Sequence, residues 1–363
     1  MASFFDRFSS KQLTIIIICI TACFLMMGGC TMVLGNEDTS DKKEKKLVFD
    51  DDDDGDDVNG RKYKFVDKED REEGVKDDSL VVNKALEGDP YKELDELIGL
   101  DAVKAEVRSL ANYVKVQKAR KEKGLKTPNL NYHLVFTGSP GTGKTTVARI
   151  VARIYKDLGI LKKGHLVETD RSGLIGQYVG QTAPRVNQMC DSALGGVLFI
   201  DEAYAITQSD AGADYGKEAV ATLLKRMEDD RDRLVVIVAG YTNEMKKFID
   251  TNPGLESRFN RYIHFPDYSA EDLYKIFRQY LKKNQYTITK EAAAFLQEHL
   301  EHKVATKDRN FGNARFARNV FEKSIQQQAN RLAGQTNLTK TQLTELTVED
   351  LKGAFSSKTN ISR

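Results

Sequence analysis

The chain has 363 residues, of which 40% are hydrophobic and 30% charged, and its formal net charge is +1. This length allows a sizeable core in two or three structural units, and the balanced charge gives no global field that would attract nucleic acid. Three of the four cysteines lie in one apolar N-terminal stretch, which leaves Cys190 alone in the rest of the chain. That excludes a disulfide framework there and is typical of a reducing compartment.

The first predicted element is the uncharged, apolar segment 13–34, which follows an N-terminal tail of residues 1–12. As a helix it would measure about 33 Å, enough for a bilayer core of about 30 Å, so we expect one transmembrane helix. A cleaved secretory signal, or a lipoprotein signal with a poor lipidation box at residues 27–30, is the alternative. Two basic residues precede the segment and four lysines at 42–46 follow it, which favours a cytoplasmic C-terminal side. We therefore expect a single-pass membrane protein with its main domain in the cytoplasm.

Residues 35–89 are polar, highly charged and poor in large apolar groups, a composition that predicts a disordered linker. The aspartate run from Asp50 to Asp54, followed by Gly55, superficially resembles a calcium loop. The twelfth position of that loop would be Arg61, where a bidentate Glu is required. A solvated acidic linker is therefore the favoured interpretation.

A globular domain begins after Pro90. Apolar residues from 94 to 114 predict an amphipathic helix, and strand-like apolar runs follow at 134–136, 197–200, 234–239 and 262–265. Helical patterns separate these runs. Continuous apolar strands that alternate with helices predict an α/β fold with a mostly parallel sheet covered on both faces.

The first of these strands runs into a glycine-rich turn, residues 138–145, that reads G-x-x-x-x-G-K-T and precedes a helical pattern. Such a turn directs backbone N–H groups at the phosphates of a nucleoside triphosphate, on a helix N-terminus. Lys144 would reach the β and γ oxygens, and the Thr145 hydroxyl would ligate Mg²⁺. The predicted cofactors are ATP and Mg²⁺, and the predicted binding residues of the turn are Gly138, Ser139, Pro140, Gly141, Thr142, Gly143, Lys144, Thr145 and Thr146.

The second strand ends in the carboxylate pair Asp201 and Glu202, at the end of a strand where open α/β sheets place their ligands. Asp201 is a predicted Mg²⁺ ligand, and Glu202 could polarise a water for attack on the γ-phosphorus. An acidic helix cap would look the same in isolation. After the third strand, Asn243 or Thr242 could orient that water, although Asn is also a common helix cap.

Together these motifs resemble those of AAA+ ATPases. Residues 138–145 resemble a Walker A motif, 197–202 a Walker B motif and 252–261 the arginine-finger segment. Residues 312–315 resemble sensor 2, and 97–100 resemble the segment that packs on adenine. The resemblance runs from about residue 94 to 355. Within the family the chain is more narrowly similar to the subgroup of CbbX-type rubisco activases and the stage V sporulation protein K, through residues 201–204, 239–241 and 313–315.

The resemblance implies an AAA+ P-loop fold with a large α/β subdomain at 90–266, a small helical lid at 267–357 and a tail at 358–363. Helical spacing after residue 269, with a last helix opening at Thr347, is typical of such a lid. The resemblance further implies a hexameric ring, in which one subunit's arginine completes its neighbour's site. The residues it assigns are Arg258, favoured over Arg261, as the finger, Ile98 and Gly99 beside adenine, and Arg315 at the γ-phosphate, with Arg318 as a rival for that last role.

Between the two Walker motifs, Tyr178, Val179 and Gly180 resemble the first pore loop of AAA+ protein threaders. An exposed aromatic residue beside glycine can hold an extended chain through nonspecific apolar contact. A buried tyrosine on a turn is the alternative. The segment 210–217 is either a second pore loop or an ordinary surface loop.

The sequence as a whole predicts a membrane-anchored AAA+ ATPase that hydrolyses ATP in a ring and remodels or partly threads a protein substrate. A nucleic-acid motor on the same fold is disfavoured by the balanced charge and by Tyr178, where a basic contact would be needed. An ATP-switched membrane assembly scaffold is disfavoured by Glu202, which a pure switch could lose. No motif encodes the substrate, and nothing in the sequence specifies a role with rubisco.

Overall fold

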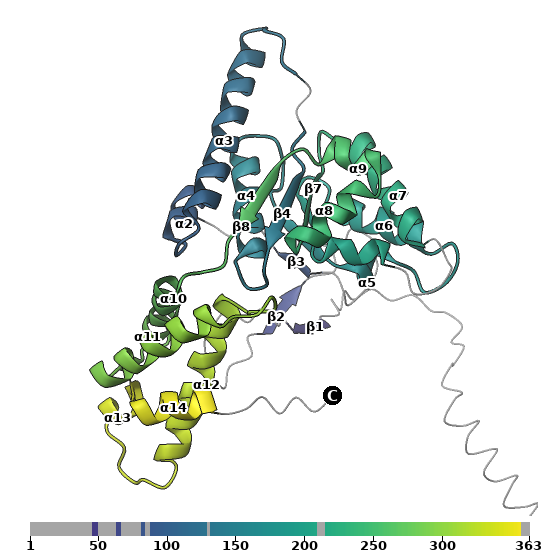
Figure 1. Cartoon of the computed structure of the whole chain (residues 1–363). Coiled ribbons are helices and arrows are strands. Elements are labelled where there is room, and N and C mark those ends of the chain that lie inside the picture. Colours follow the sequence, from purple (N-terminus) through teal and green to yellow (C-terminus); the bar gives the residue numbers. More distant parts are fainter. Residues whose placement is uncertain are drawn as a thin grey trace, which may run out of the picture. The chain divides into compact units, whose positions relative to one another are not determined.

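The computed structural model describes residues 46–49, 63–66, 81–83, 88–128, 131–208 and 215–356 (Figure 1). The chain divides into two units, Met1–Gly74 and Val75–Arg363. In the first, β1 (Lys46–Phe49) pairs antiparallel with β2 (Tyr63–Val66). The predicted transmembrane segment 13–34 and the aspartate run lie outside the described residues, whereas three short strands, β1, β2 and β3, fall within the range predicted as a linker. Among the residues described, no helix is long and apolar enough to cross a membrane.

The second unit contains a six-stranded sheet in the order β3-β5-β6-β7-β4-β8. Five strands are parallel and β3 is antiparallel at the edge. Every residue of β4, β6 and β7 is buried, so the prediction of a parallel sheet covered on both faces is confirmed. The strands are β3 (Val81–Asn83), β4 (Leu134–Gly138), β5 (Leu166–Thr169), β6 (Val197–Ile200), β7 (Val235–Gly240) and β8 (Tyr262–Phe265).

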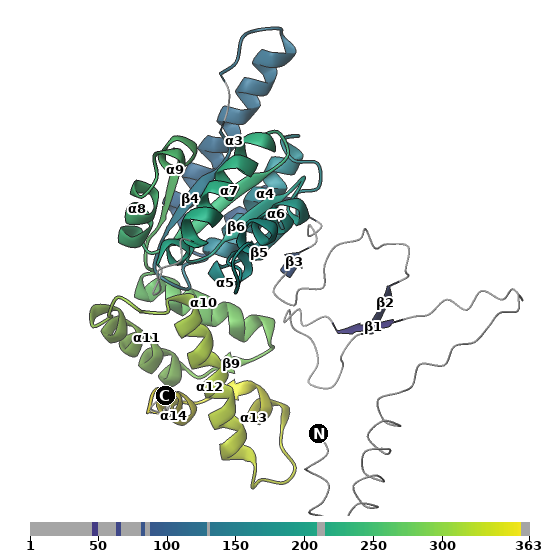
Figure 2. The same cartoon turned by 90° about the vertical axis from the view of Figure 1, so that its right-hand side faces the viewer.

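Helices cover both faces of the sheet (Figure 2). Alternate residues of the central strands enter two separate hydrophobic clusters, one on each face. On β4, Phe136 packs with residues of α3 and α4, whereas Val135 packs with residues of α6, α7 and α8. The helices of this part are α2 (Pro90–Glu96), α3 (Asp101–Glu122), α4 (Lys144–Asp157), α5 (Arg171–Leu174), α6 (Thr182–Ser192), the 3₁₀ helix η3 (Ala203–Thr207), α7 (Tyr215–Asp229), α8 (Thr242–Asp250) and α9 (Pro253–Arg258).

The first predicted helix is in fact two. α2 ends before Leu97, and the chain turns through left-handed backbone angles at Gly99 (φ 61°) and Leu100 (φ 58°) before α3 begins. The expectation of one continuous helix over 94–114 was therefore wrong. The apolar spacing runs on through the break because both helices bury their apolar faces against the same cluster.

The C-terminal part is a helical lid, as predicted. α12 packs against α10 and α14, and Phe321 of α12 lies in an aromatic cluster with Phe277, Tyr280 and Tyr286. Asp350 accepts a hydrogen bond from Thr347 N at 2.9 Å, so the last helix opens at the predicted position. The elements are α10 (Ala270–Lys283), β9 (Thr287–Ile288), α11 (Lys290–Ala305), α12 (Ala314–Leu332), α13 (Lys340–Thr344), β10 (Glu345–Leu346) and α14 (Val348–Ser356).

The lid is hydrogen-bonded directly to the glycine-rich turn. Asn313, which is fully buried, accepts from Tyr268 N at 3.0 Å and donates to Pro140 O at 3.2 Å and Asp267 Oδ1 at 2.9 Å. The N–H of Ala314 donates to Gly141 O at 3.0 Å. The start of α12 is thus fixed to the turn that was predicted to bind phosphate.

Candidate functional site

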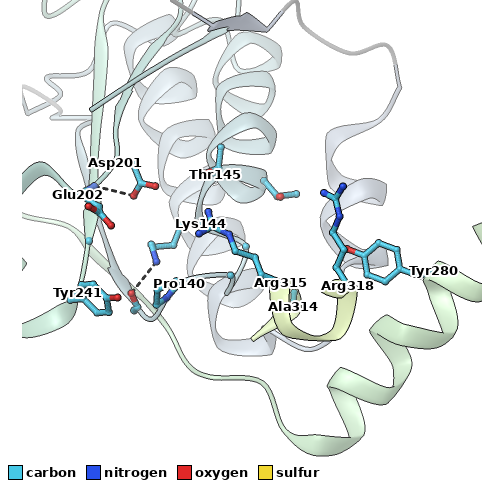
Figure 3. A pocket seen from close by; sticks show the side chains of 15 residues that line it. Pro140, Lys144, Thr145, Asp201, Glu202, Tyr241, Tyr280, Ala314, Arg315 and Arg318 are labelled. Carbon is cyan, nitrogen blue, oxygen red and sulfur yellow. Dashed lines mark hydrogen bonds between the residues drawn. The ribbon is translucent and has the colours of Figure 1, made fainter. Parts of the chain in front are cut away.

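A pocket of about 260 Å³ lies where the glycine-rich turn, the ends of β6 and β7 and the start of α12 meet (Figure 3). This is the edge of the sheet where open α/β folds bind ligands. Ten of the predicted site residues meet here, seven of them from the glycine-rich turn and the start of α4, together with Asp201, Glu202 and Arg315. The lining residues are Gly138, Pro140, Gly141, Gly143, Lys144, Thr145, Thr146, Asp201, Glu202, Gly240, Tyr241, Tyr280, Ala314, Arg315 and Arg318.

Two glycines of the turn have no room for a side chain. A Cβ on Gly138 would lie 2.3 Å from Phe265 O, and one on Gly141 would lie 2.1 Å from Gly312 O. Both residues also have positive φ, which side chains disfavour. The turn therefore lies against β8 on one side and the lid on the other, with its backbone exposed to the pocket. The remaining turn residues support it, since Thr142 is buried and donates to Ser139 O at 2.8 Å.

Lys144 is the first residue of α4 and holds its ammonium group in the middle of the pocket. Its Nζ donates to Gly138 O at 2.9 Å and to Ser139 O at 2.8 Å. Burial lowers the pKa of Lys144, and the neighbouring Asp201 carboxylate partly offsets that effect. An anionic ligand would stabilise the charged amine here, as phosphate oxygens do.

The carboxylate pair lies at one end of the pocket. Asp201 Oδ1 accepts from the N–H of Glu202 at 3.0 Å, and Glu202 has left-handed backbone angles (φ 47°, ψ 40°). Figure 3 shows both side chains on the side of the pocket where β6 ends. A general base next to a Mg²⁺ ligand is the arrangement that phosphoryl hydrolysis needs.

Thr145 and Asp201 offer the hydroxyl and carboxylate oxygens that Mg²⁺ prefers. In the part of the chain that the structure describes, no group of three or more His, Cys, Asp or Glu side chains could hold a metal alone. The donor set fits an ion that is bound by few protein ligands together with substrate phosphates. Glu168 of β5, which was not predicted from the sequence, lies beside Thr145, with its Oε1 3.5 Å from Thr145 Oγ1.

The lid supplies the opposite end of the pocket. In Figure 3 Arg315 points toward Lys144, while Tyr280 and Arg318 lie together at the end farther from Glu202. The Tyr280 ring stacks on Phe321 at 5.7 Å, and burial raises the pKa of its hydroxyl. Tyr280 was missed because its helical spacing is also that of a core residue.

Asn243 does not line this pocket, and neither does Thr242. Both line a smaller hollow of about 220 Å³ on the other side of Tyr241, together with Arg309 and other residues. β7 continues one residue further than predicted, to Gly240, and the polar side chain after its end that borders the main pocket is Tyr241. Tyr241 borders both hollows.

The segment predicted to pack on adenine lies apart from the main pocket. Ile98 lines a more open hollow against α10, and Gly99 packs against Asp272 and Tyr268. Tyr268 in turn donates to Thr142 O at 3.5 Å. Gly99 therefore packs on the residue that contacts the glycine-rich turn, and it does not line the main pocket.

Neither predicted finger arginine lines the pocket of its own chain. Arg258 ends α9 and pairs with Glu228 at 3.3 Å, while its buried Nε has no hydrogen-bond partner among the described residues. Arg261 lies over the ring of Tyr113 at 4.9 Å. A role in a neighbour's site remains a prediction.

Tyr178 and Val179 lie in the turn between α5 and α6, and their relative exposures are 68% and 86%. Gly180 follows with φ 80° and open space around it. The exposure excludes the alternative of a buried tyrosine. Residues 210–214 of the possible second pore loop lie outside the described residues.

Two family models match the chain. The model of the ATPase family associated with various cellular activities (AAA) matches residues 134–267, and the AAA lid domain matches residues 269–361. These two matches meet at the boundary between the sheet domain and the helical lid.

Several curated proteins are similar over most of their length. Protein CfxQ homolog of Cyanidium caldarium is 45% identical over 259 residues, 70% of this chain and 90% of that protein. The chloroplastic ribulose bisphosphate carboxylase/oxygenase activase of Cyanidioschyzon merolae is 44% identical over 70% of this chain and 87% of that protein. Stage V sporulation protein K of Bacillus subtilis is 39% identical over 81% of this chain and 92% of that protein.

Among solved structures, the crystal structure of the FIGL-1 AAA domain matches with a TM-score of 0.53 at 18% identity. The match covers 76% of this chain and 85% of that one. Another matching structure is the same domain in complex with ADP. At this identity the likeness concerns the fold.

Proposed function

Because this chain belongs to the AAA family of ATPases, we propose that it works as a membrane-anchored ring that hydrolyses ATP to remodel or partly thread a protein substrate. The family assignment and the pocket make it an ATP hydrolase. The observation that carries the action on a protein substrate is the exposed pair Tyr178 and Val179, which follow β5, the strand next to the one that ends at Asp201 and Glu202.

The chain's own residues divide the work of hydrolysis. The backbone of the turn and Lys144 bind the phosphates, and Glu202 takes a proton from the attacking water. Thr145 and Asp201 would hold Mg²⁺, which when bound neutralises charge on the phosphates. Arg315 extends from the lid toward Lys144. A bound ATP would therefore contact both the lid and the sheet domain. Tyr280 offers an aromatic face at the end where the base would lie.

A ring is supported by the position of Arg258. Its guanidinium lies outside its own pocket, so it can serve catalysis only from a neighbouring copy. A planar guanidinium suits the charge that develops on the transferred phosphoryl group. We expect Arg258 to act in this way and Arg261 to support the interface. Asn243, which was predicted to orient the water, lines the neighbouring hollow and not the main pocket. Tyr241, which lines the main pocket, is therefore the better candidate for orienting the water.

A protein substrate is supported by the exposed loop and by the relatives. One relative is named an activase of ribulose bisphosphate carboxylase/oxygenase. Another is the ESX-3 secretion system protein EccA3 of Mycobacterium tuberculosis, 44% identical over 71% of this chain and 44% of that protein. An exposed tyrosine beside an exposed valine can contact an extended peptide without reading its sequence. No feature of the site favours nucleic acid.

Membrane anchoring is supported by the sequence of residues 13–34 and by the lysines that follow it. A cytoplasmic ATPase domain agrees with its need for ATP. The charged residues 35–89 would then join the anchor to the ATPase domain.

The substrate loop is tested with an unfolded protein. Addition of casein to the full chain should stimulate ATP hydrolysis, and Tyr178→Ala should remove most of that stimulation because it removes the aromatic contact. Tyr178→Phe keeps the ring and serves as the matched control, so it should keep the stimulation. Equal stimulation of Tyr178→Ala and the wild type would contradict a substrate-binding loop.

A further inference from the structure

The loop between α11 and α12, residues 306–313, contacts the sheet domain at a second place besides Asn313. The guanidinium of Arg309 pairs with Glu244 in the first turn of α8 and lies over the ring of Tyr241 at 5.2 Å. The next residue, Asn310, accepts a hydrogen bond from the Tyr241 hydroxyl at 3.5 Å. We name these four residues, Tyr241, Glu244, Arg309 and Asn310, the lid clasp.

One end of the clasp belongs to the catalytic pocket. Tyr241 lines that pocket together with Glu202 and faces Arg309 on its other side. Its ring also contacts Tyr204, with centroids 6.2 Å apart, and Tyr204 is two residues beyond Glu202 in the same turn. A Cβ on Gly240 would lie 2.7 Å from the Tyr204 ring, so β7 and this turn are packed without free space. A movement of the Glu202 turn must therefore displace Tyr241.

The two attachments of the loop differ in strength. Asn313 is fully buried and makes several hydrogen bonds, so it acts as a fixed joint. The Arg309 side chain is 62% exposed, and an ion pair in that setting contributes little to stability. The hydrogen bond from Arg309, and to a lesser extent its charge, still lowers the pKa of the Glu244 carboxyl, whose buried Oε2 has no hydrogen-bond partner in the part of the chain that the structure describes. The clasp can thus open and close while the joint at Asn313 holds.

We propose that Tyr241 is a positioning residue that transmits the state of the nucleotide from Glu202 to the lid through Arg309. With ATP bound, the Glu202 turn holds Tyr241 under Arg309 and the clasp is closed. After loss of the γ-phosphate, Tyr241 shifts and the exposed ion pair opens, which frees the lid to turn about Asn313. The proposal rests on the function proposed above, because it gives the lid a motion that hydrolysis drives.

Hydrogen exchange at residues 306–313 of the full chain tests this, compared between a non-hydrolysable ATP analogue and ADP. We expect exchange in the wild type to be at least about 5-fold slower with the ATP analogue, and Arg309→Ala to reduce that difference below about 2-fold. In steady-state hydrolysis Arg309→Ala should lower kcat about 5-fold and leave KM within about 2-fold, since the residue does not line the ATP pocket.

Matched variants separate the clasp from a general weakening of the lid. Tyr241→Phe keeps the ring under Arg309 and should keep the exchange difference, whereas Tyr241→Ala should lose it. Lys275→Ala breaks an exposed ion pair that lies within α10, with Glu271 at 2.7 Å, and should leave both readouts unchanged. If Arg309→Ala keeps the full exchange difference, the proposal is overturned. ATP hydrolysis by the wild type in the same experiment would still support the proposed function. A wild type without hydrolysis would instead contradict the proposed function.

Discussion

At the scale of single residues, Glu202, the proposed general base, depends on a backbone conformation that few non-glycine residues adopt. Glu202 has φ 47° and ψ 40°, a conformation that costs a non-glycine residue about 1–3 kcal/mol. Two hydrogen bonds hold it, from Glu202 N to Asp201 Oδ1 at 3.0 Å and from Ala205 N to Glu202 O at 2.8 Å. The strain thus lies at the residue that we propose as the general base.

His133, just before β4, makes folding stability depend on pH. Burial first, and then the nearby Arg258, lower its pKa from 6.5 to about 4, and its Nδ1 accepts from Val236 N at 2.9 Å. The unfolded chain therefore binds more protons than the fold between pH 6.5 and 4, so this stability is lost as pH falls through that window. From pH 8 to pH 5 the wild type should lose about 2 kcal/mol more than His133→Gln, measured by urea denaturation. Parallel pH profiles for the two proteins would show that His133 is not held neutral.

Sequence reasoning identified the residues whose chemistry is tied to a fixed motif. Lys144, Thr145, Asp201 and Glu202 lie together in the pocket because the turn and the strand end fix their places. Asn243 was chosen for its polar side chain, yet the end of β7 presents Tyr241 to the pocket. Which side chain faces a site depends on where the strand stops and the next helix begins, and Asn243 already lies in α8.

At the scale of elements, Asn313 joins the lid to the sheet domain through its hydrogen bond to Pro140 O, and its bonds to Asp267 and Tyr268 at the junction of the two parts hold its side chain in place. Asn313→Ala leaves the buried N–H of Tyr268 without that partner, so it should cost about 1–3 kcal/mol in the free energy of unfolding. Asn319→Ala, on the exposed face of α12, is the matched control and should change it by less than about 0.5 kcal/mol. Similar losses for both variants in chemical denaturation would contradict the joint.

Elements were predictable where they were long or strictly apolar. β6 and β8 have the predicted bounds, but β5 was missed because Glu168 interrupts its short apolar run. The turn between α2 and α3 was missed because apolar spacing does not reveal the left-handed residues Gly99 and Leu100. The sequence predicted that the chain has a parallel sheet and a helical lid. It did not predict the contacts between them at Asn313 and Arg309.

At the scale of the whole molecule, one chain brings the residues that we propose for ATP binding and hydrolysis into one pocket, apart from the finger arginine. The sheet domain supplies Lys144 and Glu202, and the lid supplies Arg315, so ATP binding joins the two. Arg258 lies elsewhere, paired with Glu228. In the proposed ring, each subunit would complete the site of the next. The rate of ATP hydrolysis would therefore depend on the fraction of chains that are assembled.

Mixing two inactive variants tests this claim most directly. Glu202→Gln and Arg258→Ala should each reduce ATP hydrolysis by the full chain at least about 100-fold. In an equal mixture about a quarter of the sites would pair an intact Glu202 with a neighbour's intact Arg258, so about a quarter of wild-type activity should return. Wild-type specific activity should also rise with protein concentration. A mixture no more active than its two components, with wild-type activity independent of concentration, would contradict a site completed by a neighbouring subunit.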